Sequence, residues 1–194
     1  MLSISNKESP RTVEGRILEA AASCVLAYGV ERVTLAEIAR RAGVSRPTVY
    51  RRFPDTRSIL AALLTLRITH ALDDVPSRGV GREHVVDRVV AVAGRLRRDD
   101  VIMAVLHEAP ELAMVYLSER LGTSQQILLD TVAGELKSAQ DEGSVRAGDA
   151  RQFAAMSLLI TQSTILSAQS VEPILDAEAL ATELAHSLNG YLKP

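Results

Sequence analysis

The sequence predicts an all-helical protein, and three observations predict it. Apolar residues recur three or four positions apart almost everywhere, which is the spacing of one helix face. β-branched residues are scattered, and no alternating apolar and polar run indicates a strand. Hydrophobic residues make up 47% and charged residues 24% of the 194 positions, which is enough apolar surface for a globular core. We therefore expect about nine helices, in a small domain over 1–54 and a larger one over 55–194.

The first helix is predicted over 12–28 and ends at Gly29. Residues 1–10 before it lack the apolar core of a signal peptide and are expected to be disordered. Because Cys24 is the one cysteine, the chain can form no internal disulfide, and we expect a cytoplasmic location. The apolar stripe of this helix consists of Ile17, Ala21, Cys24, Val25 and Tyr28.

The second and third helices are short and joined by a tight turn. Thr34 and Glu37 form a T-x-x-E capping box, in which each side chain is expected to bond the other's backbone N–H. Gly43 ends the second helix, where the left-handed conformation is least costly for glycine. Ser45 is the predicted N-cap of the third helix, which is over by Phe53 because a proline follows. This arrangement is a helix-turn-helix.

The rest of the chain predicts longer helices. Asp55 is the expected N-cap of a fourth helix over 56–75, whose first half is apolar nearly all round. The uncharged segment 152–171 contains nine Ser, Thr or Gln among its twenty residues, so we expect it in a protein interior or subunit interface rather than a membrane. With Asp99, Asp149 and Asp176 as N-caps and Pro110 as a breaker, the further helices are predicted over 82–98, 100–109, 111–141, 150–171 and 177–192.

Charge is distributed unevenly along the chain. Residues 1–60 carry a net charge of +4, and the remaining residues carry −6. A basic small end on an acidic body suggests that the small end meets a polyanion, although charge blocks alone are usually solvated surface.

The third helix has one face for packing and one for binding. A helix advances by ~100° per residue, so Val49 and Phe53 share a face that packs inward. Arg46, in the first turn, can donate two bonds to guanine in a major groove, and Ser45 lies near a helix N-terminus that favours phosphate. The outward and flanking positions are Pro47, Thr48, Tyr50, Arg51 and Arg52. The alternative is a solvated arginine face on a structural helix pair.

The segment TLAEIARRAGVSRPTVYRRFPDTRSIL resembles the helix-turn-helix of the TetR family of transcriptional regulators. The shared features are a Thr-capped helix with I-A-x-x-A-G-V, a following Ser, a short helix ending Tyr-x-x-Phe and a Leu-rich fourth helix, and the match covers about residues 12–66. The resemblance implies a homodimeric repressor that binds a palindromic operator on double-stranded DNA and is released by a small-molecule effector. It assigns DNA binding to 1–54, and ligand binding and dimerisation to 55–194.

The resemblance also implies the DNA contacts. In this family a Lys usually follows the Phe by three residues and contacts phosphate, whereas this chain has Thr56 there, with Arg57 next to it. Pro47 stands where Gly is frequent, which leaves base reading to Arg46, Thr48 and Arg51. The implied contacts, with both candidates for the phosphate position, are Thr34, Ser45, Arg46, Pro47, Thr48, Tyr50, Arg51, Arg52, Thr56 and Arg57.

The larger domain offers less specific candidates. Polar residues within apolar helices are the candidate effector contacts, namely Arg67, His70, His107, Tyr116 and Gln162. The last two helices are expected to pair with their copies across a two-fold axis through Phe153, Met156, Ile160, Leu166, Leu180, Leu184 and Leu188.

Other classes of function are excluded or remain as an alternative. The sequence has no G-x-S-x-G, G-x-G-x-x-G, Walker or H-E-x-x-H motif, so we expect neither an enzyme nor a cofactor. His107, Glu108 and Glu111 are interrupted by Pro110 and joined by no cysteine, so we expect no metal site. The alternative to a DNA-binding regulator is a helical protein-interaction module whose basic N-terminal face meets an acidic partner.

Overall fold

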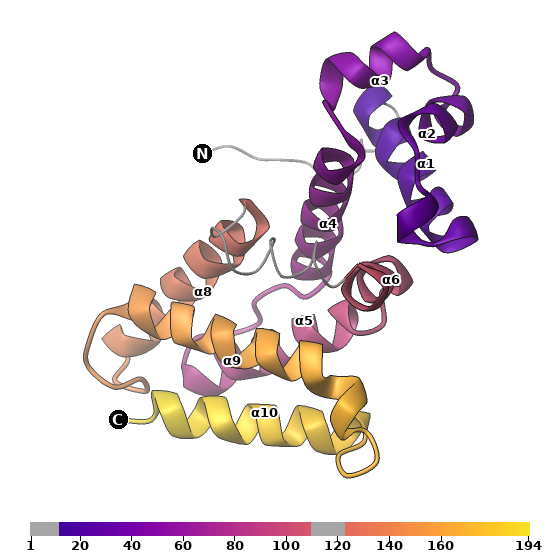
Figure 1. The fold of residues 1–194 in the computed structure, drawn as a ribbon. Coiled ribbons are helices and arrows are strands. Elements are labelled where there is room, and N and C mark those ends of the chain that lie inside the picture. Colours follow the sequence, from indigo (N-terminus) through magenta and orange to yellow (C-terminus); the bar gives the residue numbers. More distant parts are fainter. Residues whose placement is uncertain (1–11, 110–122) are drawn as a thin grey trace. The chain divides into compact units, whose positions relative to one another are not determined.

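The computed structural model describes residues 12–109 and 123–194, and the predicted all-α class is confirmed, since no strand occurs among these residues. Pro110 and the first part of the helix predicted over 111–141 lie outside them. None of the described helices is long and apolar enough to span a bilayer. The elements are α1 (Val13–Tyr28), the short 3₁₀ helix η2 (Val30–Arg32), α2 (Leu35–Ala42), α3 (Arg46–Arg52), α4 (Thr56–Asp73), α5 (Arg82–Leu96), α6 (Asp100–Glu108), α8 (Thr123–Asp141), α9 (Ala150–Val171) and α10 (Ala177–Leu192) (Figure 1).

The chain forms two compact units. Among the described residues, the first contains 12–70 and 99–109, and the second contains 71–98 and 123–194. Most of α4 therefore belongs to the first unit and its last turn to the second. The predicted domain boundary at residue 54 separates functions, namely DNA binding in 1–54 from effector binding and dimerisation in 55–194. This functional division stays a prediction.

The core of the first unit is built where α1 packs against α2 and α2 against α3. Ile17, Cys24 and Ile38 are fully buried there, and burial raises the pKa of the Cys24 thiol. Tyr28 departs from the predicted apolar stripe, because 43% of its surface is exposed and its hydroxyl accepts a hydrogen bond from Arg41. A residue at the end of α1 therefore joins the polar surface of the unit.

The second unit packs α8 on α9 and α10 on both α5 and α9. The buried face of α10 consists of Leu180, Leu184, Leu188 and Leu192. The predicted N-caps are confirmed, since Asp149 accepts from the N–H groups of Arg151 and Gln152, and Asp176 from those of Glu178 and Ala179.

One polar contact set joins three elements of the second unit. Arg88 on α5 donates to the carbonyl oxygens of Leu72 (3.3 Å) and Val75 (2.6 Å), at and just beyond the end of α4. The same guanidinium pairs with Glu135 on α8. Arg88 thus donates to the carbonyl of Leu72, one of the last carbonyls of α4, which have no partner within the helix itself.

Candidate nucleic-acid interface

The turn between α2 and α3 is defined by caps at both helices. Thr34 Oγ1 accepts from the N–H of Glu37 at 3.2 Å, as predicted. Gly43 has φ +64° and ψ +37°, the left-handed conformation expected at this position. Ser45 Oγ accepts from the N–H of Thr48 at 3.3 Å and lies 2.8 Å from its hydroxyl. These caps set the start of α3 directly after the turn.

The predicted capping box also required Glu37 to accept a hydrogen bond from the backbone N–H of Thr34, and this prediction is wrong. The carboxylate of Glu37 turns to the guanidinium groups of Arg40 and Arg41 instead of the N–H of Thr34. The physical reason is charge, since an ionised carboxylate gains more from two guanidinium donors than from one neutral amide.

The two predicted faces of α3 are present. Val49 is fully buried and Phe53 is 7% exposed, whereas Tyr50 is 57% exposed. Thr48 is half-buried, and its hydroxyl lies within hydrogen-bond distance of the Ser45 hydroxyl. The other predicted contacts on this face are all exposed, namely Arg46, Pro47, Arg51 and Arg52.

The arginines of this surface are all exposed. Within the described part of the chain, no carboxylate pairs with Arg46, Arg51, Arg52 or Arg57. A row of exposed cations without direct ion pairs attracts anions, and the phosphate backbone of DNA is a polyanion of high charge density.

The start of α4 carries its own cap. Asp55 Oδ1 accepts from the N–H of Ser58 at 2.7 Å, and this bond holds the pKa of Asp55 below its usual value. Thr56, in the first turn, is half-buried and Arg57 is exposed. The exposed cation at this helix start is therefore Arg57.

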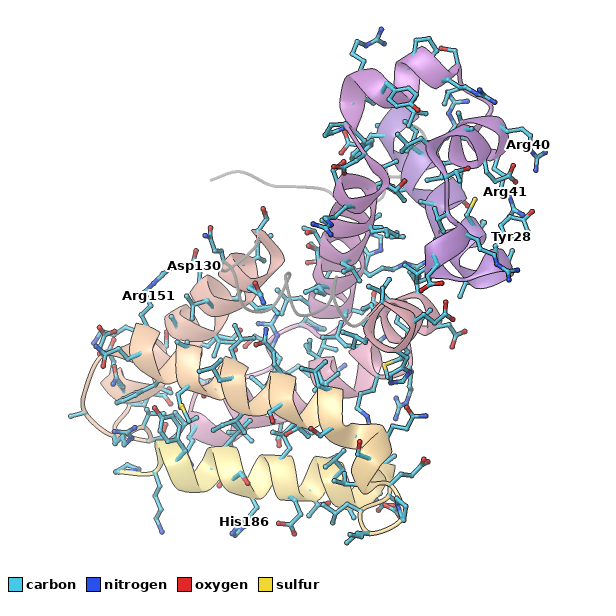
Figure 2. The ribbon with its side chains drawn as sticks, viewed as in Figure 1. Tyr28, Arg40, Arg41, Asp130, Arg151 and His186 are labelled. Atoms are coloured by element: carbon cyan, nitrogen blue, oxygen red, sulfur yellow. The ribbon has the colours of Figure 1, made fainter. Side chains whose placement is uncertain are left out.

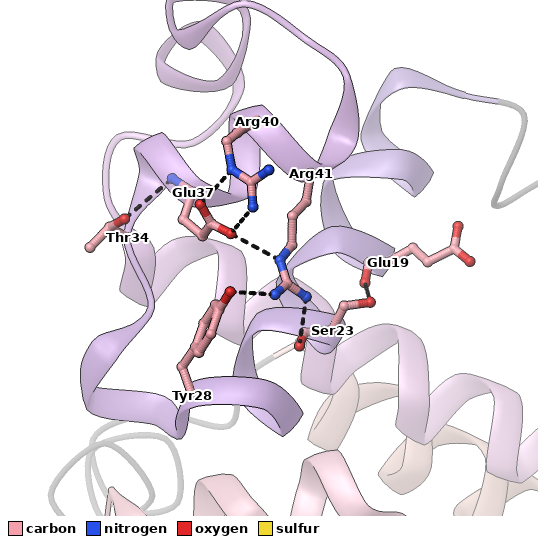
Figure 3. A network of polar contacts seen from close by, with 7 residues as sticks. All are labelled: Glu19, Ser23, Tyr28, Thr34, Glu37, Arg40 and Arg41. Carbon is pink, nitrogen blue, oxygen red and sulfur yellow. Dashed lines mark hydrogen bonds and ion pairs between the residues drawn. The ribbon is translucent and has the colours of Figure 1, made fainter.

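Glu37, Arg40 and Arg41 form the centre of a polar network on α2 (Figure 3). Glu37 lies 2.6 Å from Arg40 and 3.0 Å from Arg41. Hydrogen bonds from Arg40 and then Arg41 lower the pKa of Glu37 to about 2, so the carboxylate is ionised at neutral pH. Arg41 also donates to the Tyr28 hydroxyl and the carbonyl oxygen of Ser23, which joins α2 to α1.

The predicted effector contacts that the structure describes come from both units, with Arg67, His70 and His107 in the first and Gln162 in the second. Arg67 pairs with Asp99 at 3.2 Å, and Asp99 is also the N-cap of α6. His70 has a buried Nε2 without a hydrogen-bond partner among the described residues. The remaining candidates are the exposed His107, the half-buried Gln162, and Tyr116, which lies outside the described residues.

The predicted dimer contacts divide into two sets. Met156 (43% exposed) and Leu166 (41% exposed) project from α9, and Ile160 is half-buried beside them. The other predicted contacts need correction, because they fill the core of the second unit and have almost no surface left for a partner. These are Phe153, Leu180, Leu184 and Leu188, each at most 7% exposed.

The sequence analysis did not predict three features of the structure, namely the Glu37 network, the exposure of Leu159 and the bond between Val30 and Glu108. The spacing of Glu37 with Arg40 and Arg41 is the ordinary i, i+3 and i, i+4 spacing of helical ion pairs, so this network was readable. Leu159, 60% exposed, lies three residues after Met156 on the same face of α9. The bond from Val30 to Glu108 joins residues 78 positions apart and leaves no local signal.

Comparison with known proteins agrees with this site. The family model described as bacterial regulatory proteins, tetR family, matches residues 17–63, which contain α2, α3 and the first part of α4. A protein of Mycobacterium tuberculosis H37Rv, described as an uncharacterized HTH-type transcriptional regulator, is 64% identical over 192 residues, covering 99% of this chain and 100% of the relative. A Mycobacterium bovis protein with the same description is also 64% identical over 99% of this chain and 100% of its own.

Solved structures show the same fold at lower identity. FadR from Bacillus subtilis, in complex with stearoyl-CoA, has a TM-score of 0.67 and 20% identity over 91% of this chain and 98% of its own. The repressor QsdR of R. erythropolis has a TM-score of 0.67 and 19% identity over 94% and 96%. FadR of Thermus thermophilus, in complex with lauroyl-CoA, has a TM-score of 0.67 and 19% identity over 90% and 92%. With its helix-turn-helix and close relatives along its whole length, the chain belongs to the TetR family of transcriptional regulators.

Proposed function

We propose that the protein is a repressor that binds an inverted-repeat operator as a homodimer and leaves it when a small-molecule effector binds. The observation that carries the proposal is α3, a short helix with one buried face and exposed guanidinium groups that form no ion pair with any described residue. One helix fits the major groove of B-DNA, where outward side chains meet base edges and flanking donors meet phosphates.

Each exposed side chain of this surface has a proposed role. Arg46, at the first position of α3, donates to guanine O6 and N7, the most frequent specific contact in the major groove. Arg51 reads a second base from the next turn. The Tyr50 hydroxyl and the Arg57 guanidinium contact phosphates, which position the helix without reading sequence.

Dimerisation is proposed through the exposed face of α9. Met156, Leu159 and Leu166 are 41–60% exposed, and their spacing of three and seven residues places them on one helical stripe. Ser163 and Ser170 continue the stripe with small side chains that permit close approach of a second helix. Two copies of this stripe facing each other make an isologous contact, which presents two α3 helices to the two half-sites of a palindrome.

Effector binding is proposed in the second unit. Ser157 on α9 is 3% exposed, and its hydroxyl has no hydrogen-bond partner among the described residues. A buried hydroxyl of this kind is costly unless something bonds to it, and a ligand polar group is one such partner. Support also comes from the relatives of the same fold that were solved with stearoyl-CoA and lauroyl-CoA.

The experiment that tests the proposal is selection of bound duplexes from a random pool. A recovered inverted repeat with half-sites about 34–36 Å apart, or a multiple of that distance, supports binding by a homodimer. Addition of stearoyl-CoA or lauroyl-CoA to the purified complex then tests release. Selection of no sequence, together with no binding of any duplex at low salt, would rule the proposal out in favour of a protein-interaction module.

A further inference from the structure

The arginines of the helix-turn-helix fall into two classes that differ in what holds them. Arg46 and Arg51 on α3 are exposed and have no ion pair within the described part of the chain. Arg40 and Arg41 on α2 both bond to the single carboxylate of Glu37. The helix before the turn therefore carries two guanidinium groups that are neutralised in part, and the helix after it carries groups that are not.

Arg41 has partners besides Glu37. Its Nη1 donates to the carbonyl oxygen of Ser23 at 3.2 Å, and its Nη2 donates to the Tyr28 hydroxyl at 2.6 Å. The guanidinium also lies over the Tyr28 ring, 4.8 Å from its centroid. Loss of Glu37 alone would leave Arg41 attached to α1.

Arg40, in contrast, bonds to Glu37 alone among the residues that the structure describes. Its Nε and Nη2 bond to the two carboxylate oxygens at 2.8 and 2.6 Å, a bidentate pair, and no other partner among the described residues bonds to it. The Arg40 side chain is 69% exposed and projects from the surface of the first unit (Figure 2). Without Glu37, this guanidinium would be a free cation like those of α3.

We propose that Glu37 is a specificity-determining residue, which keeps the exposed guanidinium of Arg40 from the phosphate backbone and so limits affinity for non-operator DNA. The inference rests on the proposed function as a DNA-binding regulator. Its physical reason is that a phosphate contact strengthens binding to every sequence alike. Absence of this phosphate contact lowers the affinity for non-operator DNA, which competes with the operator for the protein.

The test is Glu37→Gln in the full chain, titrated into a 30-base-pair duplex without operator sequence and followed by fluorescence anisotropy between 50 and 200 mM KCl. Glutamine keeps the size of the side chain and the backbone N–H that Thr34 caps. We expect log K against log salt to steepen by about 0.9 per protomer, the value for one phosphate contact. The ratio of variant to wild-type affinity should therefore grow about 3.5-fold for each protomer bound, or about twelve-fold for a dimer, as salt falls from 200 to 50 mM.

Two controls distinguish a new contact between Arg40 and phosphate from the general effect of removing one negative charge. Glu31→Gln removes the same charge from an exposed residue of η2 that has no ion pair among the described residues, and it should keep the wild-type slope. The double variant Glu37→Gln with Arg40→Gln should return to the wild-type slope. Circular dichroism and thermal melting establish that each variant is folded.

Specific outcomes overturn the inference. An unchanged slope for folded Glu37→Gln would show that Arg40 gains no phosphate when released. Arg40→Gln in the wild-type background should leave the slope unchanged, and a loss of about 0.9 would show that Arg40 already contacts DNA. This loss in Arg40→Gln would overturn the inference even where Glu37→Gln does not fold. Absence of DNA binding by the wild type would reject the proposed function itself, which separates that failure from this one.

Discussion

The carboxylate of Glu108 accepts a hydrogen bond from the backbone N–H of Val30 at 2.9 Å, which joins the last residue of α6 to the start of η2. Gly29, just before Val30, has φ +78°, and a Cβ there would lie 2.8 Å from Glu108 Oε2. At its other end α6 is capped by Asp99, which also pairs with Arg67 on α4. Within the first unit, α6 is thus held to α4 at one end and to the turn after α1 at the other.

Glu108→Ala should destabilise the protein by about 1–2 kcal/mol, because the N–H of Val30 loses its acceptor in a partly buried position. Glu108→Gln keeps an acceptor oxygen and should cost less than half as much. Chemical denaturation of both variants measures the difference. Equal costs for the two variants would show that the charge of Glu108, and not the hydrogen bond to Val30, is what matters.

Gly43→Ala should destabilise the first unit by about 1–2 kcal/mol, since an L-residue in the left-handed conformation clashes with its own backbone. A Cβ at this position meets no atom within 4 Å, so the cost is conformational and not steric crowding by neighbours. Gly43→Asn is the matched control, because Asn tolerates this conformation better. Thermal melting should rank wild type above Asn and Asn above Ala, and any other order would contradict the turn geometry.

The contrast between these two sites shows which parts of the structure were readable from sequence. The Gly43 turn, the Ser45 cap and the two faces of α3 follow from local patterns, because caps and periodicity act within a few residues. The Val30–Glu108 bond depends on how α6 returns to the first unit, and no local pattern carries that information.

The same limit explains the errors on α9 and α10. A repeat of leucines such as Leu180, Leu184 and Leu188 shows that a helix has one apolar face, but not whether that face meets its own chain or another. In the structure this face fills the core of the second unit. The weaker stripe of Met156 and Leu159 stays exposed, and periodicity alone could not rank the two.

Leu159→Arg should shift the protein from dimer to monomer, because it places a charge in the centre of the proposed α9 contact, where Leu159 is 60% exposed in the single chain. Burial of an unpaired charge at an interface costs several kcal/mol, which weakens the dimer by orders of magnitude. Analytical ultracentrifugation across micromolar concentrations measures the shift. Val80→Arg, at a comparably exposed loop residue, is the control and should leave the mass unchanged. If the Leu159→Arg variant remained a dimer, the dimer interface would lie outside the exposed face of α9.

Arg46→Ala should weaken operator binding by about 1–3 kcal/mol and relax selection at one base position, as expected for a residue that bonds to a base edge. Tyr50→Phe is the comparison, because it removes one exposed hydroxyl from the neighbouring turn of α3 without changing the buried face. It should weaken binding to all duplexes about equally. Selected-duplex sequencing of both variants separates these roles, and unchanged base discrimination by Arg46→Ala would exclude this residue as a reader.

The stability that Glu37 contributes should depend on pH with a definite sign. The folded-state pKa of Glu37 is lowered from 4.5 to about 2, first by the hydrogen bond from Arg40 and then by that from Arg41. A group whose folded pKa is depressed stabilises the protein above its unfolded pKa, and this stabilisation is lost as pH falls through the folded value. The difference in unfolding free energy between wild type and Glu37→Gln should therefore be constant above about pH 5.5 and shrink between pH 4.5 and 2.

The measurement for Glu37 is urea denaturation of both proteins at each pH, in which carboxylates common to the two chains, Asp55 included, cancel in the difference. Carboxyl NMR of the folded protein provides an independent check, since the Glu37 resonance should titrate near pH 2. A midpoint near 4.5 would show that the pair with Arg40 is too mobile in solution to hold the carboxylate ionised. In that case the free energy difference would also lose its dependence on pH, because folded and unfolded chains would bind protons alike.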